Sequence, residues 1–515
     1  MQLIKRGFGP GHRIRGVLLG SAAIALAGLA AAATTTTTAT TTSDKFPRLG
    51  MISTAGPQRY ASAFQTYAAK FNLVIINGGY EGWQKGARYS KEQVIQGIKS
   101  HSFVNTRVFQ YIALNEIYNT TYAAYNPLPT WYRQVAARKW WLYPVGTEGT
   151  PVTDPQSSQK WLANMGPNVP VDPATGLGVY AWGAKYVDDL FRLGRYAGTS
   201  AAPSLDGFFL DNVLVDPSNG DGNVANGDWL RNGTTQAHNA ATTYSAVIMG
   251  EREFYTYLES AWPGSSQLGN VGGTFGLAVS NYYSGTDAAL NSQILAATSP
   301  LSGVIQGGAI EHAIGKSYSI DNWGGSLVLQ KWYQTALNNS SGSKLMILSH
   351  GGVTANGSDP LKFNSSGQPA SYSAPWQGAR YGITAALMNN GYYFADNGVY
   401  DEETTTNRLW FDEYDNGGAG VGYLGNPVAG SAGNPQTGAW SNGVWLREFQ
   451  NGVALWNPKG NGARTVNVAG LVSPAGRTGL KHITGTQDPA VNNGRAVTSV
   501  TLQDRDGLIL LWTSP

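Results

Sequence analysis

Short apolar runs that end in polar or glycine residues recur from residue 46 to about residue 400, and helix-like segments separate them. Such runs, bounded by turn residues, are typical of buried strands, whereas apolar positions three to four residues apart are typical of helices. We predict strands at 49–53, 73–77, 106–114, 207–210, 275–280, 303–310, 344–349 and 392–395. We predict helices at 60–71, 90–101, 187–196, 250–262, 326–337 and 377–388. Ser90 and Gln93 are placed to form a capping box at the start of the second helix.

Eight strand–helix units in one run favour a closed (β/α)8 barrel, the TIM barrel, over an open doubly wound sheet. No glycine fingerprint for a phosphate or dinucleotide follows the first strand. After about residue 405 the pattern becomes one of short alternating strands, split by Gly, Asn and Pro. The sequence therefore predicts an α/β fold, with a barrel at 46–405 and a small C-terminal antiparallel β-sandwich domain at 406–515.

The N-terminus carries an export pattern. Lys5, Arg6, Arg13 and Arg15 precede an apolar run rich in Ala, Leu and Gly, which predicts a signal peptide at 1–33 and a secreted or periplasmic protein. A membrane anchor is the alternative, but the run is short and rich in small residues, so we expect no stable membrane insertion. The threonine-rich tract that follows, within 34–45, cannot bury a core and is predicted to be a linker.

Composition and charge narrow the class of protein. The chain has 515 residues, of which 11% are aromatic and only 13% charged, a balance common in secreted carbohydrate-active proteins. It has no cysteine, which excludes disulfide and thiol chemistry. Removing the four positive charges of the signal peptide changes the formal net charge from +3 to −1. We therefore expect no nucleic-acid partner.

The chemistry is predicted at the carboxyl ends of the strands, where active sites of (β/α)8 barrels lie. The run 207–210 ends abruptly in Asp211, as expected of a buried strand that delivers a carboxylate to the rim of a sheet. Carboxylates bind sugar hydroxyl groups, and aromatic rings stack on sugar faces, so the predicted set of residues suits a carbohydrate substrate. Besides Asp211, the residues predicted to lie at this rim are Glu81, Trp83, Glu116, Asn212, Asn281, Tyr282, Glu311, His312, His350 and Asp396.

Glycoside hydrolysis needs two carboxyl groups in different protonation states. Asp211 after the fourth strand and Glu311 after the sixth are the predicted pair, because a strongly apolar run precedes each. Asp211 would attack the anomeric carbon, while Glu311 would protonate the leaving oxygen and then activate water. Either residue could instead be only a hydrogen-bond acceptor, and Glu116, followed by Asp396, is the reserve candidate for the second acid.

The loop after the fourth strand is similar to the calcium loop of EF-hand and dockerin modules, with oxygen-bearing side chains at alternate positions around a glycine. The first ligand position holds Pro217, which departs from that pattern. The alternative is a turn without metal. The candidate calcium ligands are Asn219, Asp221, Asn223 and Asp228. No other cofactor is expected, because His312 and His350 lack a short metal-ligand spacing.

The aromatic insertion at 117–180 allows two interpretations, the wall of a substrate cleft or a local core that covers one mouth of the barrel. The C-terminal domain likewise either binds glycan through Trp440, Trp445 or Trp456 or packs on the barrel and stiffens it. Of these two roles, packing is the more common for such domains.

The run from Asp206 to Val213, DGFFLDNV, resembles the aspartate-bearing strand of bacterial glycosyl-hydrolase-like TIM-barrel proteins, in particular hypothetical glycosyl hydrolase family fifteen. A similar strand occurs in endo-α-polygalactosaminidase-like barrels. The overall plan is similar to α-galactosidase-like barrels, whose acidic pair lies on strands four and six. The resemblance implies a retaining glycoside hydrolase with Asp211 as nucleophile and Glu311 as acid/base, although those α-galactosidases usually carry Asp on strand six.

Two other classes of function stay open. The first is a non-catalytic carbohydrate-binding or surface protein on a barrel scaffold. The second is a non-glycosidic hydrolase or lyase that uses His312 or His350 as its base.

Overall fold

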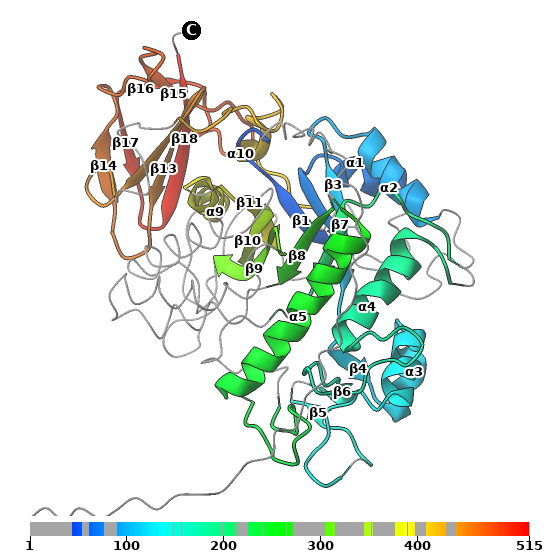
Figure 1. The fold of residues 1–515 in the computed structure, drawn as a ribbon. Coiled ribbons are helices and arrows are strands. Elements are labelled where there is room, and N and C mark those ends of the chain that lie inside the picture. Colours follow the sequence, from blue (N-terminus) through cyan, green and yellow to red (C-terminus); the bar gives the residue numbers. More distant parts are fainter. Residues whose placement is uncertain are drawn as a thin grey trace, which may run out of the picture. The chain divides into compact units, whose positions relative to one another are not determined.

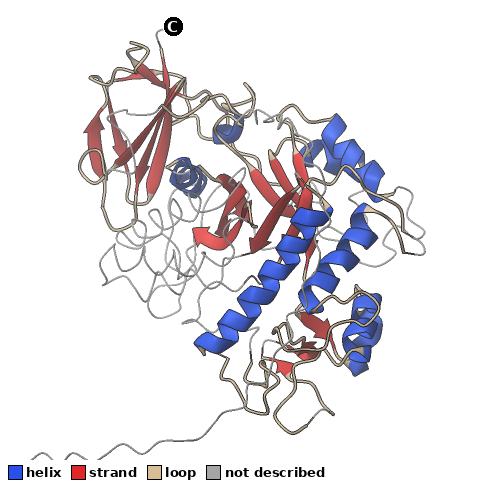
Figure 2. Ribbon diagram, viewed as in Figure 1, coloured by secondary structure: helices blue, strands red, loops and turns tan. Residues whose placement is uncertain are grey.

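A computed structural model provides the fold. The residues that it describes are 44–53, 61–76, 90–147, 149–155, 157–196, 199–211, 213, 225–238, 240–263, 265–270, 304–314, 345–351, 353, 376–388, 390–396, 408–428 and 439–513. The predicted signal peptide and nearly all of the predicted linker lie outside these residues. Within them the protein is a mixed α/β structure (Figures 1 and 2).

Eight parallel strands form one sheet, and their order in the sheet follows their order in the chain. The strands are β1 (Gly50–Ser53), β2 (Leu73–Ile76), β3 (Arg107–Ile112), β7 (Gly207–Leu210), β8 (Ser266–Asn270), β9 (Gly307–Ile314), β10 (Leu345–Gly351) and β11 (Tyr392–Asp396). A parallel sheet covered on both faces needs nearly continuous apolar runs, which is why β2 reads LVII and β7 reads GFFL.

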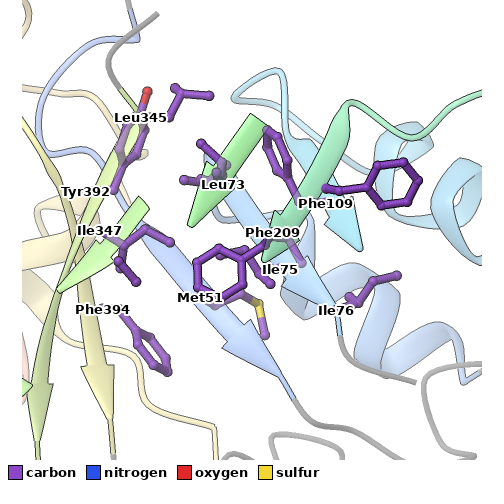
Figure 3. Packing of buried hydrophobic residues seen from close by; sticks show 14 of the residues in the cluster. Met51, Leu73, Ile75, Ile76, Phe109, Phe209, Leu345, Ile347, Tyr392 and Phe394 are labelled. Atoms are coloured by element: carbon purple, nitrogen blue, oxygen red, sulfur yellow. The ribbon is translucent and has the colours of Figure 1, made fainter. Parts of the chain in front are cut away.

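Residues from strands that are not neighbours meet on one face of this sheet, so the sheet is strongly curled. Arg107 at the start of β3 lies 2.5 Å from the Tyr392 hydroxyl at the start of β11, and 2.5 Å from Oδ2 of Asp44. A Cβ atom added to Gly50 in β1 would lie 3.1 Å from Cγ1 of Ile347 in β10. The face that these residues share is the inner face. Figure 3 shows part of the apolar cluster to which the strands of the sheet contribute.

The first and last strands of the sheet, β1 and β11, approach each other, and an isolated bridge forms next to β1. Leu49 forms a parallel bridge with Tyr393, whose N–H donates to the carbonyl oxygen of Arg48 at 2.9 Å. A paired ladder between β1 and β11 does not form, so the ring of ladders is not closed.

The opposite, outer face of the sheet packs against helices. In β7, the ring of Phe208 packs against the rings of Phe191 and Trp262, with ring centroids 6.4 Å and 5.9 Å away. In β3, Gln110 accepts a hydrogen bond from the buried Lys91 at 2.9 Å. Because side chains alternate along a strand, the residues between these positions belong to the inner face.

The described helices associated with the eight-stranded sheet agree broadly with the predicted ones. They are α1 (Ser62–Ala68), α2 (Lys91–Ser100), α4 (Val179–Val187) with the π-turn η3 (Asp188–Arg192), α5 (Ala241–Ala261) and α9 (Gln377–Leu387). The capping box of Ser90 and Gln93 is confirmed. The helix predicted at 187–196 begins earlier, at Val179, and the helix predicted at 326–337 lies outside the described residues.

The residues predicted as the fifth strand, 275–280, lie outside the described residues. The fifth strand of the sheet is β8, which pairs with β7 from Ser266 and with β9 from Leu268. Its sequence, SQLGN, holds a single large apolar residue, so hydrophobic patterning missed it. Pairing with a strand on each side supplies the backbone hydrogen bonds that fix such a strand despite its polar composition.

An insertion follows β3 and forms its own small sheet. Its elements are β4 (Glu116–Tyr118), the 3-10 helix η2 (Thr120–Tyr125), α3 (Pro129–Ala137), β5 (Thr153–Asp154) and β6 (Ser157–Leu162). The three strands are antiparallel, in the order β4-β6-β5.

The C-terminal region is antiparallel β structure after the short helix α10 (Asp412–Asp415). The strands are β12 (Trp445–Phe449), β13 (Gly452–Asn457), β14 (Arg464–Asn467), β15 (Leu480–His482), β16 (Ala496–Val497), β17 (Ser499–Leu502) and β18 (Asp506–Trp512). A five-stranded sheet, β12-β13-β18-β15-β16, and a two-stranded sheet, β14-β17, share one apolar core.

Helix α9 packs against this C-terminal region. The Trp456 ring lies 5.9 Å from the ring of Tyr381, and Arg380 pairs with Asp488 and, at 3.3 Å, with Asp506. A Cβ atom on Gly507 would lie 1.9 Å from Oγ1 of Thr384, so this close approach requires glycine.

Candidate active site

Asp211 lies at the carboxyl end of β7, directly after Leu210. Its backbone N–H donates to the carbonyl oxygen of Ile112 at 2.7 Å, which continues the pairing between β3 and β7 by one residue. Phe209, two residues earlier, has the Tyr111 ring as a neighbour on the inner face. Alternation therefore places Asp211 on the inner face as well, half-buried at the rim of the sheet.

The side chain of Asp211 accepts a short hydrogen bond from the hydroxyl group of Tyr111, at its Oδ2 atom. Tyr111 comes from β3, the neighbouring strand, and pairs in register with Phe209. The two rings stack, with centroids 5.8 Å apart and planes 26° apart. The rim of the sheet thus holds a carboxylate in a fixed orientation against a phenol.

Tyr111 was missed by the sequence prediction, which collected only residues that follow the strands. It occupies the next-to-last position of β3 and reaches a carboxylate that follows β7. The sequence did contain a signal for this residue. Every second residue of β3 lies on the same face, and the last of Arg107, Phe109 and Tyr111 carries a hydroxyl group near the carboxyl end of the strand.

Two further polar residues lie near the carboxyl ends of the last strands. Asp396 ends β11 and is fully buried. Ser349 in β10 is 2% exposed, and its Oγ atom has no hydrogen-bond partner among the described residues. Ser349 pairs in register with Phe394 and alternates with His350, which places it on the inner face.

His350 faces the helix layer. Its side chain is fully buried, and its Nδ1 atom lies 2.8 Å from the Tyr393 hydroxyl. A Cβ atom on Gly382 in α9 would lie 2.1 Å from the same nitrogen. We therefore leave His350 out of the proposed site, because this environment is that of a packed structural histidine.

Glu116, the reserve acid, lies in β4 of the insertion. Its Oε2 atom pairs with Nζ of Lys160 at 2.5 Å. Burial alone would lower the pKa of Lys160, but the hydrogen bond and the charge of Glu116 outweigh it, so this pKa is raised. Because the carboxylate of Glu116 is engaged in this ion pair, we leave Glu116 out of the proposed acid/base role.

The aromatic insertion contributes buried rings to the main apolar core. Trp131, Trp140, Trp141 and Tyr143 are all buried, and the indole N–H of Trp131 donates to the carbonyl oxygen of Leu114 at 2.9 Å. Tyr132 and Trp161 are among the insertion's partly buried aromatic residues. The four buried rings belong to the same apolar cluster as the strands of the eight-stranded sheet, which favours a core role for them over the wall of a cleft.

Aromatic packing also accounts for the tryptophans of the C-terminal region. Trp445 and Trp456 are buried, and Trp440 packs against the apolar core that the two sheets share. These contacts favour the packing role over glycan binding through these side chains.

Asp228 is the one candidate calcium ligand among the described residues, and it closes a turn. Its Oδ1 atom accepts from the N–H of Asn232 at 2.9 Å and its Oδ2 atom from the N–H of Gly233 at 3.0 Å. Within the described ranges, no group of three His, Asp or Glu side chains is placed to hold a metal ion.

The side chains of the remaining predicted residues are not among those that the structure describes. Glu311 and His312 are described only as backbone, inside β9 rather than after it. The other residues of this set are Glu81, Trp83, Asn212, Asn219, Asp221, Asn223, Asn281 and Tyr282.

No family model matches the chain, and no curated protein matches it. None of the families that the DGFFLDNV run resembles is therefore confirmed. Within the part of the chain that the structure describes, no helix is long and apolar enough to cross a membrane.

Solved structures of glycoside hydrolases share a similar arrangement of the chain. An alpha-amylase from Anoxybacillus is 10% identical, covers 91% of this chain and 98% of its own, and has a TM-score of 0.42. A glycoside hydrolase family 30 subfamily 8 xylanase from Clostridium acetobutylicum is 13% identical, covers 90% and 94%, and has a TM-score of 0.38.

The glycoside hydrolase domain of PelA from Pseudomonas aeruginosa is 11% identical, covers 69% of this chain and 96% of its own, and has a TM-score of 0.35. At TM-scores this low these likenesses carry no functional argument, so the chemistry must be inferred from this chain's own residues.

Proposed function

We propose that this protein is a glycoside hydrolase that cleaves a poly- or oligosaccharide with retention of configuration. Asp211 is the proposed nucleophile and Glu311 the proposed acid/base. The observation that carries the proposal is the carboxylate of Asp211 at the carboxyl end of an inner-facing strand, held by the Tyr111 hydroxyl. A group held by a rigid strand keeps the orientation that nucleophilic attack requires.

The proposed reaction has two steps. In the first, Oδ1 of Asp211 attacks the anomeric carbon, the bond from that carbon to the leaving oxygen breaks, and Glu311 gives its proton to that oxygen. In the second, Glu311 removes a proton from a water molecule whose oxygen attacks the anomeric carbon, and the bond to Asp211 breaks. Both carboxyl groups then return to their starting protonation states.

We also propose that the eight-stranded sheet forms a (β/α)8 barrel and that the two C-terminal sheets form a β-sandwich. The bridge between Leu49 and Tyr393 supports the first of these, and the shared apolar core supports the second. Export to the periplasm or the medium, and a structural calcium in the loop at 219–228, are parts of the same proposal.

The sugar contacts are proposed at the rim around Asp211. Buried Asp396 and Ser349 belong to this set on the strength of their strand positions. The other proposed contacts are Glu81, Trp83, Asn212, Asn281, Tyr282 and His312.

The test is release of reducing sugar from a panel of α- and β-linked glycans by wild type, Asp211→Asn and Glu311→Gln. We expect cleavage of at least one glycan and a loss of about a thousandfold or more in the Asp211 variant. Asp206→Asn is the matched control, because Asp206 lies at the other end of the same strand, where it binds the N–H of Val108 at 2.7 Å. It should keep wild-type activity.

Retention is tested by the anomer of the first product and by mass spectrometry of a fluoro-sugar ester trapped on Asp211. Full activity in Asp211→Asn would contradict the proposed nucleophile. If no glycan is cleaved but one binds, the carbohydrate-binding alternative replaces the hydrolase. Full activity in Glu311→Gln would move the second role to Asp396.

A further inference from the structure

We propose that Tyr111 is a positioning residue for Asp211: its hydroxyl group holds Oδ2 of the carboxylate, so that Oδ1 faces the anomeric carbon, and it favours the ionised form. This inference rests on the proposed role of Asp211 as nucleophile. It concerns a residue that strand-end patterning did not single out, in the strand next to the one that carries the carboxylate.

The register of two neighbouring strands brings the pair together. Tyr111 pairs with Phe209, and residues paired in a parallel ladder project to the same face. Asp211 lies two residues beyond Phe209 and therefore on that face again. Diagonal neighbours of this kind are within reach of a long aromatic side chain, and the hydroxyl of Tyr111 accordingly meets Oδ2 of Asp211.

The tyrosine is held in place before any substrate binds. Its ring stacks on Phe209 at 5.8 Å. Its carbonyl oxygen accepts a hydrogen bond from Nε2 of Gln110 at 2.9 Å, and Oε1 of Gln110 accepts from the buried Lys91 at 2.9 Å. A donor fixed in this way loses little conformational freedom when it orients a carboxylate.

The chemistry of the contact gives it two effects. A phenolic hydroxyl that donates to a carboxylate favours the charged form over the protonated one. It also restricts rotation of the carboxylate, which leaves the attack to the oxygen that the phenol does not contact. A tyrosine that served only to pack its ring would have neither effect, and its replacement by phenylalanine would be silent.

The experiment compares wild type with Tyr111→Phe on whichever glycan is cleaved. We expect kcat to fall about 10- to 100-fold with little change in KM, because the lost interaction acts on the reacting group. We expect the acid limb of the kcat/KM profile to move to higher pH by about one unit, because the ionised carboxylate loses a donor. Unchanged kcat and an unchanged pH profile would overturn the inference.

Tyr257→Phe is the matched control, since it removes the same oxygen atom from a half-buried tyrosine on α5. It should keep the wild-type rate and pH profile. Thermal unfolding of both variants checks that each is folded at the assay temperature.

A second readout does not depend on activity. A carbodiimide with an amine modifies carboxyl groups less as they ionise, and peptide mass spectrometry measures the extent at Asp211 against pH, with Asp206 on the same peptide as internal reference. In Tyr111→Phe the modification of Asp211 should persist to higher pH than in wild type. If no glycan is cleaved and this shift occurs, the contact stands while the hydrolase proposal fails; an unshifted profile overturns the positioning role.

Discussion

An aspartate accepts a hydrogen bond from a tyrosine hydroxyl group at the amino ends of the eight parallel strands, and another does so at their carboxyl ends. The surroundings of the two aspartates differ. At the amino end, Asp44 accepts from Tyr392 at 2.7 Å and from Arg107 at 2.5 Å. At the carboxyl end, Asp211 accepts from Tyr111, whose ring packs on a phenylalanine. The positive charge of a guanidinium group compensates for the hydration that a buried carboxylate loses, so such an ion pair stabilises the fold. A phenol is uncharged, so it orients a carboxylate without neutralising its negative charge. The same two residue types can therefore serve stability at one end and chemistry at the other.

Removing the cation at the amino end is expected to have the largest effect on stability. Arg107→Leu leaves Asp44, whose side chain is 9% exposed, without its charge partner, which costs about 3 kcal/mol of unfolding free energy. Urea unfolding measures this, and activity per folded molecule should stay at the wild-type level.

The control for this change is Arg138→Leu. Its partner Asp172 also accepts from Gln134 and Thr175, so we expect a loss of about 1 kcal/mol. Equal losses in the two variants would show that the pair at the amino end has no special role.

The curl that separates an inner from an outer face can be tested at Gly50. Gly50→Ala places a methyl group 3.1 Å from Ile347 and 3.3 Å from Tyr392, and we expect overpacking to cost about 2 kcal/mol. Thermal or urea unfolding measures the loss. Gly149→Ala, where no atom lies within 4 Å of the added group, should be neutral. A neutral Gly50 variant would mean that the strands are not packed across the inner face.

A third buried carboxylate extends the comparison to pH. Burial raises the pKa of Glu413, although a hydrogen bond from Asn492 and the charge of Arg380 oppose the shift. The folded state therefore binds this proton more tightly than the unfolded state does, so Glu413 contributes less stability as pH rises through its folded pKa.

We expect the difference in unfolding free energy between Glu413→Gln and wild type to favour the variant increasingly as pH rises above the ordinary pKa of a glutamate and through the raised, folded-state pKa of Glu413. Glu259→Gln, on the exposed surface of α5, is the control for the loss of a carboxyl group. A difference that grows on acidification would contradict the sign of the shift.

The smallest expected effect is at the rim. Ser349→Ala removes a buried hydroxyl group that has no hydrogen-bond partner among the described residues, so the unfolding free energy should change by less than about 0.5 kcal/mol. Ser473→Ala is the contrast, since its Oγ atom accepts from the N–H of Arg477 at 3.0 Å, and should lose about 1 kcal/mol. A large loss in Ser349→Ala would show a structural role and remove it from the proposed sugar contacts.

Much of the fold could be predicted from the sequence. Seven of the eight strands of the sheet follow apolar runs whose positions overlap the predicted ones, and the capping box at Ser90 is a local signal. The exception, β8, owes its conformation to the strands on both sides rather than to its own residues. Pairing between distant segments leaves no mark in a local pattern, which is why this strand was missed.

The site was less accessible to prediction. The pattern placed Asp211 at a strand end, and the structure puts it there. The pattern also placed His350 at the rim, as a substrate contact, yet that side chain faces α9. The strand runs on to Gly351, and side chains near its end point to alternate faces of the sheet. The Tyr111 contact depends on register between two strands, which residue order alone does not reveal.

Strand β3 contributes one residue to each of the two aspartate contacts compared above. Arg107 and Tyr111 lie on the same face of β3 and are separated by about 13 Å along the strand. A shift of β3 by one residue, or the deletion of one residue within it, would break both contacts together. The two contacts therefore fix the register of this strand. The long insertion follows Ile112, the last residue of β3, so the added residues do not alter the contacts of Arg107 or Tyr111. The insertion therefore lengthens the chain at this point without changing the length of β3.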